Sequence, residues 1–445
     1  MLPGVTQRTE ATDRIICMLA AMPPTPDVTA PGAAVPDRGR ADACPGALRL
    51  HTADDGGLAR VRLPGGLLTV RQAIALAEAS QALGDGELET TSRGNVQLRG
   101  LAPDCGAELG ERLRAVGLLP SDTHERVRNI VASPLAGLDT LGNADVQAWV
   151  RELDARLCAS DWAAGLSGKF LFALDDGRGD VAALDADVTL IAARGGPALL
   201  RLGRAEHGHP VEAGQEVTAV LDAARAFLDA LRGSGRKAWH LREVPDLLPA
   251  GTVPLPTACV PSASGSVGAL PGGLSVGMRF GRASAAQWRA LVAASAGELR
   301  LTPWRGAVLP GVPADRLPAL AAAGFRTEPG SAWERATACT GLPGCAKSLA
   351  DVRADAARAL DTGAGAGSGA VSGAGAGAGT GGLPVHWSGC ERRCGHPAGR
   401  WVDVLATGHG YRVTVNGPTT TAGAPVDVRN EEMAEAVAEA RRTTK

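Results

Sequence analysis

The chain has 445 residues, of which 45% are hydrophobic and 21% charged, as is typical of a folded protein with more than one domain. Its 45 lysines and arginines are balanced by 47 acidic residues, and the net charge of −2 excludes a globally basic nucleic-acid-binding protein. No apolar run reaches the ~18 residues of a membrane-spanning helix, and the N-terminal residues make a poor signal peptide. We therefore expect a cytoplasmic protein with neither nucleic-acid nor membrane partners.

Helices and strands alternate irregularly along the predicted fold. Helical apolar spacing predicts helices over residues 70–83, 105–116, 144–158, 215–231, 285–294, 346–360 and 431–442. Alternating or short apolar runs predict strands over residues 57–63, 88–101 (a hairpin with its turn at 93–95), 169–174, 188–193, 401–406 and 411–416. Because several strands are joined by hairpin-length turns, the pattern favours an α+β fold over a doubly wound sheet.

The chain repeats itself in order. The matching segments are 62–63 with 279–280, the helix 70–83 with the helix 285–294, 87–96 with 298–308, and 128–134 with 335–341. Matching segments that follow one another in the same order predict a duplication about a pseudo-twofold axis. The interface between the two halves is the natural place for a large ligand.

Domain boundaries follow from this repeat. We expect a disordered tail at 1–43, a first half-domain at 44–117, a first α+β domain at 118–255, a second half-domain at 256–328, and a C-terminal metal-binding domain at 329–445. Residues 361–382 are almost entirely Gly, Ala, Ser and Thr, which predicts a flexible insert inside the last domain.

Four of the nine cysteines form two tight pairs. Cys339 and Cys345 give C-x5-C, and Cys390 and Cys394 give C-x3-C, both in Gly-rich loops. Four thiolates are the standard ligand set of a [4Fe–4S] cluster, and zinc or four unliganded thiols remain as alternatives. The remaining cysteines are scattered and are predicted to be core or surface residues: Cys17, Cys44, Cys105, Cys158 and Cys259. Among them only Cys44, in Ala-Cys-Pro-Gly, stands out.

The two cysteine loops resemble the cluster motif of the siroheme-dependent nitrite and sulfite reductase superfamily. Residues 91–100, Thr-Ser-Arg-Gly-Asn-Val-Gln-Leu-Arg-Gly, resemble its ferredoxin-like half-domain signature, and the duplication matches its architecture. Residues 44–49, 60–66 and 389–394 are most similar to the precorrin-3B synthase branch. The resemblance covers about residues 44–425 apart from the insert. It implies a duplicated α+β fold with ferredoxin-like half-domains and a pseudo-twofold axis.

The resemblance to this branch implies a monooxygenase of cobalamin biosynthesis that uses O2 to hydroxylate precorrin-3A and close a γ-lactone. NADH would be the ultimate electron donor. Because the sequence has no Rossmann fingerprint, we expect a separate reductase or a ferredoxin to deliver the electrons. A siroheme-dependent nitrite or sulfite reductase and a non-catalytic iron–sulfur or tetrapyrrole carrier are the alternatives.

Basic residues are the predicted ligands of the anionic tetrapyrrole, because the guanidinium fork pairs bidentately with carboxylates. The residues that match family positions facing the anion, expected to act in binding and catalysis, are Arg93, Arg128 and Lys169. Further substrate-binding candidates on neighbouring strand faces are Arg60, Arg62, Asn95 and Gln97. Sulfite reductases usually carry a second Lys two positions after the first, where this chain has Leu171, which argues against that activity.

A mononuclear non-haem iron would need histidine and carboxylate ligands. His386 and His396 flank the second cysteine pair but form no motif with clear geometry, so the ligands of any second iron remain open. His207 and His209, in Glu-His-Gly-His-Pro, are predicted to lie in an exposed loop.

Overall fold

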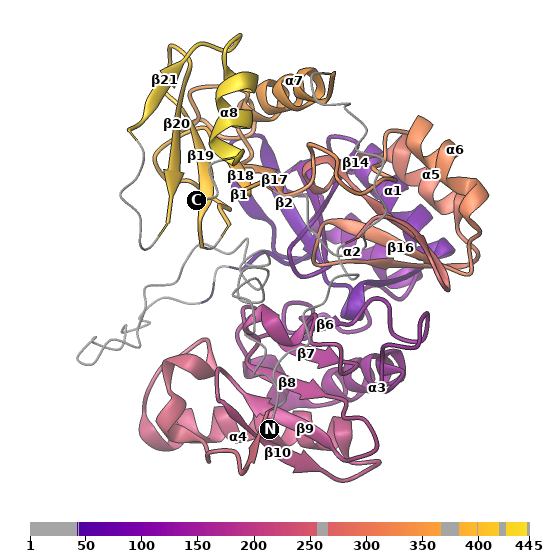
Figure 1. Ribbon diagram of the computed structural model, residues 1–445. Helices are drawn as coiled ribbons and strands as arrows, with labels where there is room; N and C mark the ends of the chain where they lie inside the picture. Colours follow the sequence, from indigo (N-terminus) through magenta and orange to yellow (C-terminus); the bar gives the residue numbers. More distant parts are fainter. Residues whose placement is uncertain are drawn as a thin grey trace, which may run out of the picture.

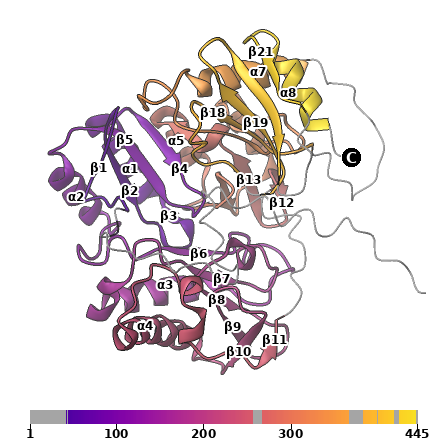
Figure 2. The same ribbon diagram turned by 90° about the vertical axis from the view of Figure 1, so that its left-hand side faces the viewer.

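The structure is a computed structural model that describes residue 42 and residues 44–255, 266–365, 382–397, 399–417 and 424–442. The described strands form a pair of central sheets and one sheet in each of two outer domains. Figure 1 shows the half-domains in the middle, the domain of β6 to β11 below them and the C-terminal domain above. Figure 2 shows the first half-domain on the left and the C-terminal domain at the upper right. The mixture of sheets and helices confirms the α+β fold class.

The first half-domain is an antiparallel sheet with the order β1-β2-β5-β4-β14. Its own strands and helices are β1 (His51–Ala53), β2 (Gly56–Val61), β4 (Glu87–Thr90), β5 (Val96–Leu101), α1 (Val70–Leu83) and α2 (Gly106–Ala115). The alternating apolar residues of β2 and β5 are buried in one core with the apolar face of α1.

The second half-domain repeats this arrangement with the order β12-β13-β16-β15-β3. Its own elements are β12 (Gly268–Leu270), β13 (Gly273–Gly277), β15 (Glu298–Leu301), β16 (Gly306–Pro310), α5 (Ala285–Ala294) and α6 (Leu317–Ala322). The matching strand order in two sequence segments shows the duplication directly.

The two half-domains exchange a strand. β3 (Leu67–Thr69) from the first half pairs with β15, and β14 (Arg282–Ser284) from the second half pairs with β4. The helices α1 and α5 pack on each other, and Trp288 Nε1 in α5 donates a hydrogen bond to the Ala73 carbonyl in α1 at 2.9 Å. This reciprocal exchange confirms the predicted pseudo-twofold axis and makes the two halves share one core.

The helix starts carry the same duplication in detail. Thr69 and Ser284 are the N-caps of α1 and α5, and each forms a capping box with a glutamine, Gln72 or Gln287. Gln72 Nε2 also donates to the carbonyl of the residue after α2 at 3.2 Å, and Gln287 Nε2 to that of the residue after α6 at 3.0 Å. Each glutamine therefore joins the start of one helix to the end of the next.

The outer domains share one strand pattern, in which two parallel pairings precede antiparallel ones, three in the first domain and two in the C-terminal domain. The first contains β6 (Ile130–Ala132), β7 (Phe172–Asp175), β8 (Val188–Ile191), β9 (Ala198–Leu202), β10 (His207–Val211), β11 (Val253–Pro254), α3 (Val146–Cys158) and α4 (Glu216–Ser234). The C-terminal one contains β17 (Ala336–Ala338), β18 (Val385–Ser388), β19 (Trp401–Ala406), β20 (Tyr411–Asn416), β21 (Val426–Val428), α7 (Val352–Gly365) and α8 (Met433–Arg442). The duplication thus includes the outer domains.

Some predicted boundaries are wrong. The helix expected from residue 346 starts only at Val352, because the chain turns first, with the Ser348 N–H donating to the Cys345 carbonyl at 2.9 Å. The strand expected over 169–174 occupies Phe172–Asp175. His207 and His209 lie on β10, paired with β9 and β11, and not in a loop.

The Gly/Ala-rich run begins as helix. α7 continues to Gly365, and Asp361 accepts a hydrogen bond from Trp333 Nε1 at 3.1 Å. The flexible insert was therefore predicted to start too early, at residue 361. Residues 366–381 of that run, and residues 1–41 and 43 of the predicted tail, lie outside the described residues. Among the helices of the described ranges, none combines the length and the apolar character that crossing a bilayer requires.

The strand exchange predicts a glycine requirement at Gly66, directly before β3. Gly66 has φ 71°, and a Cβ there would lie 2.0 Å from the Leu301 carbonyl oxygen in β15. We expect Gly66→Ala to lose about 1–2 kcal/mol from the left-handed backbone and a further ~1–3 kcal/mol from the overlap. Gly195→Ala is the control, with φ 66° and no atom within 4 Å of its Cβ. Urea denaturation midpoints measure both, and equal losses would contradict the proposed close approach.

Candidate functional site

The paired cysteines lie on two loops that follow adjacent parallel strands, β17 and β18. Cys339 follows β17 and Cys390 follows β18, at the same edge of the sheet. The Cys339 N–H donates to the Trp387 carbonyl at 2.9 Å, and the Gly389 N–H donates to Cys339 Sγ at 3.2 Å. The Leu349 N–H also donates to the Gly389 carbonyl at 2.9 Å. The fold therefore brings together loops that are about 50 residues apart in sequence, as the hydrogen bond between Gly389 and Cys339 shows.

Glycines allow the two loops to approach each other. A Cβ at Gly389 would lie 1.8 Å from Ser348 Oγ, and one at Gly341, whose φ is 70°, would lie 2.8 Å from a methyl carbon of Val352. Neither position has room for a larger residue without movement of its neighbours. This physical requirement explains the Gly-rich context of both cysteine pairs.

The four sulfurs are not gathered as the ligands of a bound zinc ion would be. Tetrahedral zinc with Zn–S of about 2.3 Å brings its sulfurs within about 4 Å of one another. Within the described part of the chain, no three of these sulfurs lie within 4.8 Å of one another. A cluster with four irons spreads its thiolates more widely. Two buried atoms beside the loops, His386 Nε2 and Ser388 Oγ, have no hydrogen-bond partner among the described residues. A bound cluster could satisfy such groups.

The two histidines beside the cysteines both contact Trp401. His396 stacks on its ring at 5.0 Å and 13°, and His386 meets it edge-on at 5.8 Å. Burial lowers the pKa of His386 to about 3, with Arg305 and His396 adding to the effect, so this imidazole is neutral at physiological pH. Its Nδ1 is bonded to Thr337 Oγ1 at 2.8 Å. No carboxylate joins the two rings within 4.8 Å in the described ranges, so a histidine–carboxylate iron site is not assembled there.

A cluster of cations lies at the end of the first sheet, around Arg62. This side chain is only 3% exposed, and its Nη2 donates to the Gly168 carbonyl at 3.2 Å. Its Nη1 is buried without a partner among the described residues. Burial, together with the positive charges of Arg60 and Arg93, lowers the pKa of Arg62 to about 9. Burial likewise lowers the pKa of Arg93 to about 10. These cations are held close together at an energetic cost that a bound anion would offset.

Lys169 borders the same cluster. Arg93 Nη1 donates to the Lys169 carbonyl at 3.2 Å, and Lys169 Nζ lies 4.0 Å from the centre of the Trp239 ring. Arg60 Nε donates to Gln97 Oε1 at 3.1 Å. We call the group Arg60, Arg62, Arg93 and Lys169 the cation cluster.

The side chains of Arg128 and Asn95 both bond to other residues of the protein, which gives them structural roles. Arg128 Nε and Nη2 each bond Asp154 at 2.7 Å, and Nη1 donates to a main-chain carbonyl at 3.0 Å. Asn95 Oδ1 accepts from the Leu63 N–H at 2.9 Å, and Nδ2 donates to Asn129 Oδ1 at 3.2 Å. Both side chains are buried with these partners, and the ligand roles expected for them stay predictions. Sequence could not show this, because Asp154 lies on a separate helix.

Sequence analysis missed Glu89, a buried carboxylate that connects the cation cluster to the cysteines. Glu89 is 7% exposed, and its Oε1 lies 2.6 Å from Arg353 Nη1 and 3.1 Å from Arg282 Nε. Gln97 Nε2 donates to its other oxygen at 3.4 Å. Arg353 Nε donates to the Cys339 carbonyl at 3.1 Å. Hydrogen bonds thus run from Gln97 through Glu89 to the first cysteine loop. The sequence of β4, Glu-Leu-Glu-Thr, is mostly polar and gave no signal that Glu89 is buried.

The first half-domain also holds the cysteine loop directly, through the turn between β1 and β2. Asp54 Oδ2 accepts a hydrogen bond from the Ala346 N–H at 2.7 Å. Arg99 forms a bidentate pair with Asp55 at 2.8 Å and reaches the Gly344 carbonyl at 3.4 Å. The position of the cysteines is therefore set partly by a different domain.

The loop after β7, which corresponds to the Cys390 loop after β18, carries buried aspartates. Carboxylate oxygens of Asp175, Asp176 and Asp180 lie within 4.8 Å of one another. Four main-chain N–H groups donate to Asp175 at 2.8 to 3.1 Å, and Asp176 pairs with Arg178 at 2.7 Å. These bonds stabilise the loop from within, so we assign the aspartates a structural role.

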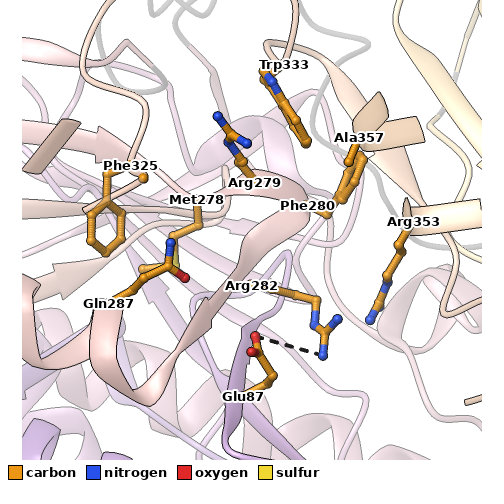
Figure 3. A pocket seen from close by; sticks show the side chains of 11 residues that line it. Glu87, Met278, Arg279, Phe280, Arg282, Gln287, Phe325, Trp333, Arg353 and Ala357 are labelled. Carbon is orange, nitrogen blue, oxygen red and sulfur yellow. Dashed lines mark ion pairs between the residues drawn. The ribbon is translucent and has the colours of Figure 1, made fainter. Parts of the chain in front are cut away.

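A cavity of about 210 Å³ opens where the second half-domain meets the C-terminal domain (Figure 3). Arg279 lies 4.5 Å above the ring of Trp333, whose other neighbour is Phe280 at 5.0 Å. The dashed line in Figure 3 joins Glu87 to Arg282, which are 4.0 Å apart. Sites for drug-sized ligands usually enclose about 300 to 1,000 Å³, so this cavity is too small for a tetrapyrrole.

Comparison with known proteins finds the same similarity as the sequence motifs. The family description "nitrite/sulfite reductase ferredoxin-like half domain" matches residues 51–116 and 271–323. The chain carries two such half domains. It is 28% identical over 403 residues to precorrin-3B synthase from Sinorhizobium sp, which covers 85% of this chain and 83% of that protein. The resemblance inferred from the cysteine and half-domain motifs is therefore confirmed.

A further relative and a solved structure are similar to this chain. A ferredoxin–nitrite reductase of Synechococcus elongatus is 39% identical over 127 residues, which are 27% of this chain and 25% of that protein. The structure of the Mycobacterium tuberculosis NirA protein aligns with a TM-score of 0.60 and 21% identity over 85% of this chain and 79% of that chain. The structural likeness shows a shared fold, and the reductase match is confined to about a quarter of each chain.

Glu89 generates a prediction on stability and pH. Burial raises the pKa of Glu89, but Arg353 and Arg282 outweigh it and hold that pKa below its usual range. Its stabilising contribution is therefore present above its ordinary pKa of 4.5 and is lost as the pH falls through the folded-state value. Calorimetry at pH 7 should show Glu89→Gln destabilised by about 3–5 kcal/mol, because two buried cations lose their partner.

The difference between Glu89→Gln and the unmodified protein should narrow as the pH falls below 4.5. Glu108→Gln is the matched control, because Glu108 pairs with Arg112 at 2.7 Å on an exposed helix face. An unchanged melting temperature for Glu89→Gln at pH 7 would show that the buried network carries no stability.

The cysteine loops generate a prediction on metal content. Cys345→Ser should lose most bound iron and acid-labile sulfide and yield less folded protein, because a closed metal site contributes directly to folding. Cys105→Ser is the control, a half-buried thiol before α2. Iron and sulfide are assayed after anaerobic purification. Normal iron in Cys345→Ser would remove this residue from the ligand set.

Proposed function

We propose that this protein is a monooxygenase of the precorrin-3B synthase type, which hydroxylates precorrin-3A with O2 and forms a γ-lactone. The observation that carries the proposal is the similarity to a precorrin-3B synthase over 85% of this chain. The ferredoxin–nitrite reductase of Synechococcus elongatus, by comparison, matches only 27% of it. The cation cluster supports an anionic ligand, and the two cysteine loops support an electron-transfer cofactor.

The cation cluster would bind and orient the substrate. Precorrin-3A is a polycarboxylate, and a guanidinium binds a carboxylate with two parallel hydrogen bonds. Arg62 presents an Nη1 without a partner among the described residues, and Arg60 and Arg93 add positive charge beside it. Lys169 completes the cationic wall near Trp239. Charge pairing in a poorly solvated site would hold the macrocycle in one orientation.

The electrons would enter at the other end of the Glu89 network. Cys339, Cys345, Cys390 and Cys394 would hold a [4Fe–4S] cluster, which supplies electrons one at a time when it is bound. Hydroxylation places one atom of O2 in the product and reduces the other to water, with two electrons and two protons consumed. We propose that NADH supplies these electrons through a separate reductase or a ferredoxin.

A siroheme-dependent nitrite or sulfite reductase is the second candidate, favoured by the local match to ferredoxin–nitrite reductases. The residue two positions after Lys169 counts against it. Leu171 is buried in a small apolar cluster with Val131 and Ala173, so it supplies no proton donor to a distal pocket. A carrier without catalytic activity would bind precorrin-3A and return it unchanged.

The decisive experiment begins with anaerobic purification and assays of iron, acid-labile sulfide and extractable pigment. The protein is then incubated with precorrin-3A, a reductant and isotopically labelled O2, and the product is examined by mass spectrometry. A product with one labelled oxygen atom supports the proposal. Stoichiometric siroheme with nitrite or sulfite turnover would replace it with the reductase, and binding without turnover would replace it with the carrier.

A substitution in the cation cluster should stabilise the ligand-free protein and at the same time weaken its binding of a polycarboxylate. Arg62→Met should raise the melting temperature of the ligand-free protein, because it removes a buried charge that burial and neighbouring cations disfavour. The same variant should lose most of the thermal stabilisation by uroporphyrin III, a polycarboxylate probe. For the unmodified protein that stabilisation should reach about 2.7 kcal/mol at a hundredfold excess over the dissociation constant.

The control for Arg62→Met is Arg114→Met, which removes an exposed guanidinium paired with Asp122 at 2.7 Å. Its melting temperature and its response to uroporphyrin III should both match the unmodified protein. If Arg62→Met kept the full ligand-induced shift, the cation cluster would not be the carboxylate site.

A further inference from the structure

The Ala-Cys-Pro-Gly motif, which the sequence analysis singled out, forms a strap across the edge of the first half-domain. We define the strap as residue 42 and residues 44–48. Glu125 Oε2 accepts hydrogen bonds from the N–H groups of Ala47 at 2.8 Å and Leu48 at 3.0 Å. A Cβ at Gly46 would lie 2.1 Å from Glu125 Oε1, so only glycine lets the strap approach this carboxylate. The motif is therefore held in place by a residue far along the chain.

The strap also binds the loop that carries Lys169. Asp42 Oδ2 accepts hydrogen bonds from Ser167 Oγ at 2.8 Å and the Gly168 N–H at 2.6 Å, and Asp42 Oδ1 accepts from the Cys44 N–H at 3.0 Å. A Cβ at Gly168 would lie only 3.1 Å from Cys44 Cβ. Gly168 is the same residue whose carbonyl accepts the hydrogen bond from Arg62 Nη2. Strap, loop and cation cluster are thus one packed unit.

Cys44 lies within the electrostatic reach of the cation cluster. Its thiol is half-buried and interacts with the charges of Asp42, Arg62 and Arg60. Burial raises the pKa of the Cys44 thiol, Asp42 raises it further, and the two guanidiniums only partly oppose this. The sulfur is therefore a neutral thiol at physiological pH. The Arg60 N–H donates to the Gly46 carbonyl at 3.0 Å, which fixes the strap beside β2.

We propose that Cys44 forms one wall of the carboxylate site, so that a substrate carboxylate bound to Arg62 Nη1 covers the Cys44 sulfur. The independent observation is the buried Arg62 Nη1, which has no partner in the described part of the chain. Arg62 and Cys44 meet at Gly168, whose carbonyl accepts from Arg62 Nη2 at 3.2 Å and whose Cβ would lie 3.1 Å from Cys44 Cβ. The proposal rests on the proposed function for the ligand class, a polycarboxylate tetrapyrrole. Cys44 thereby determines which side chain of the macrocycle fits next to Arg62.

A cavity at Cys44 offers access to a small reagent. Cys44 and Pro45 line a cavity of about 260 Å³ together with Arg49, Leu50 and His51. A reagent that enters this cavity should alkylate Cys44 in the free protein, and a carboxylate that covers the sulfur should slow the reaction in the complex. Its reactivity therefore reports occupancy of the carboxylate site.

The test measures alkylation of each cysteine in the full-length holoprotein by N-ethylmaleimide, with and without saturating uroporphyrin III. Peptide mass spectrometry follows the individual thiols, and an absorbance titration measures binding separately. We expect Cys44 alkylation to slow at least tenfold, with half-protection at the dissociation constant of the titration. The internal controls are Cys105 and Cys158, half-buried thiols whose rates should not change.

The outcomes separate this inference from the proposed function. Absence of uroporphyrin III binding would overturn the proposed function and this inference with it. Binding with an unchanged Cys44 rate would overturn the inference alone. Nitrite, sulfite and phosphate form a parallel arm, because small oxyanions share the charge of a carboxylate. Protection by one of these, without protection by uroporphyrin III, would also overturn the assignment to a tetrapyrrole carboxylate.

Asp42→Asn tests the strap as a positioning element. We expect weaker acceptance of the Gly168 hydrogen bond to reduce uroporphyrin III affinity by about fivefold, which corresponds to about 1 kcal/mol. The strap should also open, so Cys44 alkylation in the free protein should become faster. Asp122→Asn is the matched control, because this exposed carboxylate pairs with Arg114 of α2 at 2.7 Å. A lower melting temperature with unchanged affinity and alkylation rate would reduce Asp42 to a purely structural role and contradict the proposal.

Discussion

The buried carboxylate of Glu89 is the contact on which the relative placement of the half-domains and the cysteine loops depends. It comes from β4 of the first half-domain, and its partners are Arg282 from the exchanged strand β14 and Arg353 from α7 of the C-terminal domain. A buried carboxylate without partners is strongly disfavoured. Its burial is therefore compatible only with an arrangement in which all three parts meet. Arg353 also donates a hydrogen bond to the carbonyl of Cys339, so the same arginine positions the loop of the predicted metal ligands.

The cation cluster has the opposite electrostatic character. At Glu89 each charge has a partner, whereas Arg62 is buried beside Arg60 and Arg93 with one nitrogen unpaired in the described chain. Such an arrangement stores unfavourable energy in the free protein, which an anionic ligand would release. The strap from Asp42 to Leu48 holds this cluster against the loop of Lys169. The contacts of the cation cluster therefore affect both ligand binding and the stability of the fold, as is common at functional sites.

The duplicated scaffold provides matching loops, and the two halves use them differently. After β7, aspartates fold the loop through hydrogen bonds to its own backbone and to Arg178. After β18, the corresponding loop carries Cys390 and Cys394, and the buried Ser388 Oγ beside it lacks a partner among the described residues. One loop is complete without a ligand, and the other has groups that a cofactor would satisfy. Divergence on a symmetric frame accounts for this difference without a change of topology.

Local patterns in the sequence determined the α+β class, the repeat, the helices α1 and α5, the paired cysteines and the superfamily resemblance, because period, spacing and capping depend on neighbouring residues. Only the tertiary structure decided which polar side chains serve a site. Arg128 and Asn95 matched binding motifs but are occupied by Asp154 and Asn129, whereas Glu89 matched none and joins three domains. The physical reason is that a buried charge takes its role from its partners, and those partners lie on elements whose closeness arises only when the chain folds.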